Sequence, residues 1–134
     1  MAIIQPLKKI FNWETAHDHV YSKIVYLYPA SNIVLDSVAH KTIYMIKGIV
    51  TSDISFTLSA QANPLPGDQI ILCSRPDSTA GDITYSYDAN NFYLTQCSSP
   101  VDPPESVFDN GSQQEDVTIF TFNGTKFCST FDNC

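Results

Sequence analysis

The feature that most restricts the fold of this chain is a pair of alternating runs on either side of Asn123-Gly124. Apolar and polar side chains alternate through much of residues 117–122 and 125–131, as they do in strands with one buried face. Asn-Gly between two such runs is the strongest short-range hairpin signal, because a two-residue type I′ turn needs positive φ at both central residues. The sequence therefore predicts an antiparallel hairpin closed by a type I′ turn.

Strand signals recur along the rest of the chain, whereas helical periodicity persists nowhere. Residues 54–59 and 83–87 alternate cleanly and predict half-buried strands. Other runs are more continuously apolar and rich in β-branched and aromatic residues, which suits strands covered on both faces by a second sheet or by another subunit. These runs are residues 20–28, 42–50 and 69–73, with residues 91–97 as a further strand.

The segments between these runs contain residues that end strands. Proline lacks the N–H of a ladder and glycine tolerates positive φ, so residues 29–32, 63–68 and 98–105 are predicted to be loops, with an exposed loop tip at 109–115. A chain of 134 residues is one domain by length. The pattern predicts an all-β fold of roughly seven to nine strands, a single-domain β-sandwich or jelly-roll-like domain over residues 20–134.

Residues 1–19 differ from the rest and are predicted to be an N-terminal arm or an edge strand. The first thirteen residues are largely apolar, and no turn closes them onto the next strand. An arm that docks on a neighbour needs apolar anchors to offset its ordering entropy. The candidate partner-binding residues are Ile3, Ile4, Leu7, Lys8, Lys9, Phe11 and Trp13. The alternative is that these side chains fill the domain's own core.

The net charge of −7 makes a nucleic acid an improbable partner, because binding to phosphates needs clustered Lys and Arg. No apolar run is long enough to cross a bilayer, so no membrane partner is expected. Lys8 and Lys9 follow an apolar start, the reverse of the order in a secretory signal. We therefore expect that the protein is made in a cytoplasm and stays there.

The four cysteines form no CxxC pair, which argues against a zinc knuckle, and reduced thiols are expected in a chain without a secretory signal. Asn110 and Asn123 begin glycosylation sequons, but each precedes a glycine and is better interpreted as part of a turn.

Candidate chemistry is sparse. His17 and His19 would share one face of a strand and could bind a transition metal with His40 or with a residue of a symmetry mate, but His17-Asp18-His19 without another marker is usually an exposed turn. Acidic residues gather in the loops predicted near the C-terminal part of the chain, where paired carboxylates could perform glycoside hydrolysis or bind calcium. They lack the spacing of a calcium loop, and solvation accounts for acids on exposed loops. Those acids are Asp102, Glu105, Asp109, Glu115 and Asp116. With no nucleophile motif or phosphate loop, the sequence predicts a protein that is not an enzyme and has no catalytic residue, metal or cofactor.

The second half of the chain resembles virion surface proteins of tailed bacteriophages, which include capsid decoration (cement) proteins and fibre-tip domains. The resemblance is carried by Gly67-Asp68 entering an apolar strand, by a strand of Val-Thr-Ile type at residues 117–119, and by the hairpin turn Asn123-Gly124-Thr125 before an aromatic residue. It covers roughly residues 54–131. Phe127 stands where the family usually has tryptophan or tyrosine.

This resemblance implies a β-sandwich that forms homotrimers on the outside of a phage capsid after assembly in the host cytoplasm. The expected partner is the major capsid protein or another virion protein, and the expected function is to stabilise the capsid through symmetric protein–protein contacts. Seven tyrosines in the chain also suit an interface. The alternative is a receptor- or glycan-binding module of a head or tail fibre.

Overall fold

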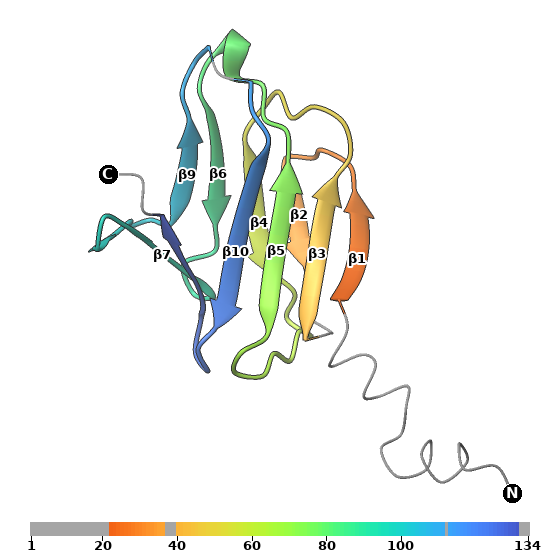
Figure 1. Ribbon diagram of the computed structural model, residues 1–134, viewed down its shortest axis with the longest axis vertical. Coiled ribbons are helices and arrows are strands. Elements are labelled where there is room, and N and C mark those ends of the chain that lie inside the picture. Colours follow the sequence, from red (N-terminus) through yellow and green to blue (C-terminus); the bar gives the residue numbers. More distant parts are fainter. Residues whose placement is uncertain (1–21, 37–39, 112, 132–134) are drawn as a thin grey trace, which may run out of the picture.

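The computed structural model describes residues 22–36, 40–111 and 113–131 as eleven strands in two stacked sheets (Figure 1). The expectation of an all-β sandwich is confirmed. No helix in these three stretches is long and apolar enough to cross a membrane. The expected arm or edge strand at residues 1–19 lies outside the described residues.

The larger sheet has seven strands. In spatial order they are β1 (Ser22–Leu27), β3 (Lys41–Ile46), β5 (Gln69–Ser74), β10 (Asp116–Phe122), β11 (Phe127–Phe131), β7 (Phe92–Gln96) and β8 (Ser99–Pro100). β1, β3 and β5 are parallel to one another, and β10 runs antiparallel to both β5 and β11. β11 and β7 are again parallel.

The smaller sheet has four strands: β2 (Asn32–Leu35), β4 (Ile54–Leu58), β6 (Ile83–Tyr87) and β9 (Glu105–Phe108). β2, β4 and β6 are parallel, and β9 closes the sheet as an antiparallel edge. A single 3₁₀ turn, η1 (Ser78–Ala80), lies between β5 and β6, and the Asp77 side chain caps it by accepting the Thr79 N–H.

From β1 to β6 the chain crosses between the two sheets at every step. Parallel neighbours need a crossover, and here a strand of the opposite sheet provides it. β1–β2, β3–β4 and β5–β6 therefore form three successive arches, each stacked on the one before. This connectivity departs from the antiparallel order of a jelly roll.

The core fills the space between the sheets and is rich in aromatic rings. Phe56 stacks on Tyr87 with ring centroids 5.4 Å apart, and Phe120 of the larger sheet meets Tyr87 edge-on at 5.0 Å. Phe120 also contacts Phe92 at 5.1 Å. These rings are at most 4% exposed, so the two sheets are held together by a dry aromatic layer.

The predicted C-terminal hairpin is confirmed, but the predicted type I′ turn is wrong. Phe122 pairs with Phe127, which leaves a four-residue loop, and only Gly124 in it has positive φ. The Asn123 side chain explains the wider loop, because its Oδ1 accepts the N–H groups of Thr125 and Lys126 at 2.8 and 2.9 Å. The register therefore differs by two residues from that of a two-residue turn, which keeps every side chain on its expected face.

Candidate functional site

Two rows of apolar side chains cross the outer face of the larger sheet. Successive side chains of a strand point to opposite faces, so residues two apart share a face. One row contains the paired residues Ile24, Ile43, Ile71 and Ile119, on β1, β3, β5 and β10. The adjacent row contains Tyr26, Met45, Cys73 and Val117 on the same strands. We call these eight side chains the apolar patch.

Most of the apolar patch is open to solvent. Val117 is 60% exposed and Tyr26 57%, whereas their neighbours Thr118 and Phe120, on the other face of β10, are almost fully buried. In Figure 1 β10, β5 and β3 run in front of β4 and β2 of the smaller sheet, so this outer face is turned toward the viewer. Large exposed apolar patches are typical of interaction sites, which makes this face a candidate protein interface.

Charged side chains border the apolar patch at both ends of its strands. Lys41 begins β3, while Lys47 and Arg75 directly follow β3 and β5, and Glu115 directly precedes β10. The Lys47 Nζ lies 4.7 Å from the centroid of the Tyr26 ring, a cation–π contact. Among the outward-pointing side chains at these strand ends three are basic and one is acidic, because Asp68 and Asp116, which also flank β5 and β10, lie on the inward side. The border is therefore basic in an acidic protein.

The outer face of the smaller sheet has a different character. Its outward positions are mainly hydroxyl-bearing, since Ser55, Thr57, Thr84 and Ser86 alternate with core residues on β4 and β6. Val34 and Val107 on its two edge strands are isolated exposed apolar residues, at 60% and 50%. The two outer faces of one sandwich thus differ, and only the larger sheet presents a contiguous apolar surface.

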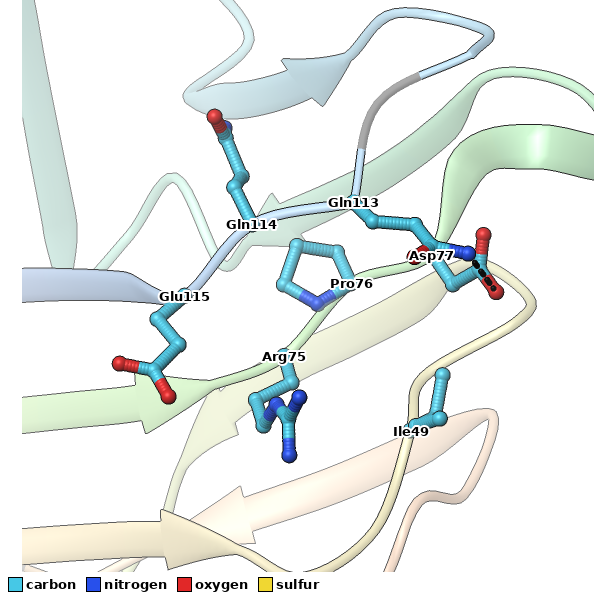
Figure 2. A pocket seen from close by; sticks show the side chains of 7 residues that line it. All are labelled: Ile49, Arg75, Pro76, Asp77, Gln113, Gln114 and Glu115. Atoms are coloured by element: carbon cyan, nitrogen blue, oxygen red, sulfur yellow. Dashed lines mark hydrogen bonds between the residues drawn. The ribbon is translucent and has the colours of Figure 1, made fainter.

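A shallow cavity lies beside the border of the apolar patch, and Figure 2 shows its lining. It encloses about 220 Å³ between Ile49, Arg75–Asp77 and Gln113–Glu115. Gln113 Nε2 donates to Asp77 Oδ2 at 3.2 Å, and hydrogen bonds from Thr79 lower the pKa of Asp77. Ligand pockets usually enclose about 300 Å³ or more, so this hollow is smaller than a typical small-molecule site.

Asp116 points into the sandwich at the start of β10. Its Oδ2 accepts the Thr118 hydroxyl at 3.0 Å, and burial raises the pKa of its carboxyl group. Nearby, the Tyr85 hydroxyl lies 2.9 Å from Ser74 Oγ, and burial raises the pKa of Tyr85 to about 12. These groups form an interior polar cluster that holds the end of the core together. The sequence expectation that Asp116 is an exposed loop acid is wrong.

Several predicted functional residues cannot be placed. The candidate partner-binding residues, Ile3, Ile4, Leu7, Lys8, Lys9, Phe11 and Trp13, lie outside the described residues, as do His17 and His19. His40 is exposed, and its Nδ1 lies 3.6 Å from Asp68 Oδ1. Within the described stretches no three His, Cys, Asp or Glu side chains gather as metal ligands.

The apolar patch itself was not predicted as a site, although the sequence contained its signal. Residues 20–28, 42–50 and 69–73 were expected to need cover on both faces, and they contain β1, β3 and β5. The missing information was the register, which places the outward residues of these strands side by side and adds Val117 and Ile119 of β10.

The three cysteines in the described residues divide into two groups. Cys73 and Cys128 are free thiols on the outer face of the larger sheet, and burial together with the Asp116 charge raises the pKa of Cys73. Cys97, at the exposed end of β7, is disulfide-bonded. The expectation of reduced thiols is therefore wrong for Cys97.

Fold and surface together define a β-sandwich module with a candidate protein interface on one sheet. Comparison with known proteins adds no identity, because no protein-family model matches the chain and no curated protein has a significantly similar sequence. The function must therefore be argued from the surface that the fold creates.

Proposed function

We propose that this chain is a non-catalytic structural protein, a capsid decoration (cement) protein that binds the outer surface of a phage capsid as a homotrimer. The observation that carries the proposal is the contrast between the two outer faces of the sandwich. One is a contiguous apolar patch with a basic border, and the other is rich in hydroxyl groups. A subunit that touches other protein copies on one side and water on the other needs this asymmetry.

A decoration protein works through many weak contacts. Copies that bind the assembled lattice, and not its separate subunits, stabilise the lattice by mass action. In this proposal the N-terminal segment supplies the grip on the capsid through Ile3, Ile4, Leu7, Lys8, Lys9, Phe11 and Trp13. The acidic remainder of the surface keeps neighbouring copies soluble on a crowded particle.

The proposal is tested by deleting the gene in the virus that carries it and purifying the capsids. Capsids without the protein should lose their DNA at a lower temperature, and adding the purified protein back should restore the original temperature. Quantitative mass spectrometry of complete particles should find hundreds of copies of the chain. Complete particles that contain no copy, or capsids equally stable without it, would count against the role.

A second candidate is a receptor- or glycan-binding module of a head or tail fibre. It is favoured by exposed tyrosines, since Tyr28 is 73% exposed, Tyr26 57% and Tyr93 40%, and such rings suit sugar binding as well as protein contacts. A fibre module should occur in few copies per particle, and the isolated protein should bind host cells. Copy number therefore separates the two candidates.

A further inference from the structure

We infer that the apolar patch is the contact surface between copies of this chain, so that a second copy of the same protein packs on β1, β3, β5 and β10. The inference rests on the proposed function, in which the chain acts as an assembly subunit, and it names the surface that holds copies together. Capsid contacts are then left to other parts of the chain.

The first argument is the apolar composition of the parallel strands β1, β3 and β5, which the equally parallel strands β2, β4 and β6 do not share on their outer face. Sheets of parallel strands occur almost only with both faces covered, and their strands are correspondingly apolar on both sides. Here the inner face packs against the smaller sheet, while Ile24 and Met45 on the outer face remain 52% and 39% exposed. The strands have the composition of a doubly covered sheet, but within the described residues only one face is covered.

The second argument is size. Four strands at about 4.8 Å spacing and five residues at about 3.3 Å per residue give a flat footprint of about 300 Å². Including β11 and β7 extends it to about 500 Å², and protruding side chains make the accessible area larger. A standard interface buries about 800 Å² on each partner. This footprint is smaller than the standard interface, so the outer face of the larger sheet suits a weak contact between copies.

The third argument is charge, and it favours a copy of this chain as the occupant. The eight side chains of the apolar patch include no ionisable acid or base other than the Cys73 thiol and the Tyr26 phenol. Of the eleven acidic side chains in the described part, Glu115 lies at the border, Asp68 and Asp116 flank β5 and β10, and the other eight belong to other elements. Copies that meet at this face around a threefold axis keep their acidic surfaces apart, and each contributes its apolar rows to the shared contact. Lys41, Lys47 and Arg75 stay at the rim, where water and salt screen them.

The chain offers a matched pair of variants for the test. Val117 lies in the apolar patch and Val34 on the outer face of the smaller sheet, and both are 60% exposed. Val117→Lys and Val34→Lys therefore introduce the same charge at equal exposure on opposite faces. Tyr26→Lys changes a different strand of the patch, so it tests the same surface even if Val117→Lys fails to fold.

Sedimentation equilibrium of the full-length chain over a series of micromolar concentrations gives the test. The wild type and Val34→Lys should form assemblies of two or more copies with the same dissociation constant. Val117→Lys and Tyr26→Lys, with wild-type far-ultraviolet circular dichroism, should raise that constant at least tenfold. A monomeric wild type, or assembly that neither patch variant weakens, would overturn the inference.

The same variants separate this inference from the proposed function. A wild type that stays monomeric but binds and stabilises capsids would support the capsid role, and it would reject both the self-contact and the homotrimer of the proposed function. An assembly that depends on Val117 but never appears on particles would support the self-contact and reject the capsid role.

Discussion

Replacing Phe120 by alanine tests the assignment of the two faces of β10 most directly. Phe120 is fully buried between the sheets and contacts the rings of Tyr87 and Phe92 at 5.0 and 5.1 Å. Aromatic pairs contribute about 0.5–1.5 kcal/mol each beyond their buried area. Together with the cavity left behind, truncation of a buried phenylalanine costs about 3–5 kcal/mol. We expect Phe120→Ala to lower the free energy of unfolding by about 4 kcal/mol, from a total of about 5–15 kcal/mol for a domain.

The adjacent residue provides the control. Ile119 is 47% exposed on the opposite face of the same strand, so Ile119→Ala should change the free energy of unfolding by less than about 1 kcal/mol. Urea unfolding followed by circular dichroism, at a concentration too low for self-association, measures both. The thermal midpoint should fall by about 10–15 °C for Phe120→Ala. Equal losses for the two variants would mean that the inward and outward faces of β10 have been misassigned.

Three further predictions follow from particular residues. Burial raises the pKa of Asp116 above its value in the unfolded chain, so its contribution to stability is fully present below pH 3.8 and is lost as the pH rises through its pKa in the folded protein. Asp116→Asn should therefore be more stable than the wild type at pH 7. An equal or lower urea midpoint for the variant at that pH would contradict this. Asn123→Ala removes the acceptor for two backbone N–H groups in the hairpin loop and should cost about 1 kcal/mol of unfolding free energy, whereas an unchanged urea midpoint would show that the loop does not need these bonds. Removing residues 1–13 should leave the circular dichroism spectrum and self-association intact but abolish binding to capsids in a co-sedimentation assay, and retained binding would reject the arm as the anchor.

The sequence predicted the strands whose side chains carry a strong local signal. Residues 54–59 and 83–87 alternate clearly, and they correspond to β4 and β6. β2 was missed because it has only four residues and directly follows a segment with Pro29. β8 and the start of β9 lie in or beside the proline-rich segment at 98–105, where proline argued for a loop.

The order of the strands could not be predicted, because parallel pairing joins residues far apart in sequence. Lys41 pairs with Gln69, and Ile54 pairs with Tyr85, with no local motif to mark either pair. The candidate interface depends on this order, since Ile24, Ile71 and Ile119 become neighbours only through the register of three strand pairs. Composition indicated that the apolar strands needed cover on both faces, but only the topology shows where the uncovered face lies.

The stacked arches give the sandwich a direction in which it can change length. Each arch adds one strand to each sheet and shares its core with the arch before it, while β9 and β10 close the β5–β6 end by antiparallel pairing. Duplication of the β3–β4 arch would thus widen both sheets by a single strand and leave the closing strands untouched. A sandwich built this way can enlarge its outer face in discrete steps, in contrast to a Greek-key barrel, whose closure fixes the strand count.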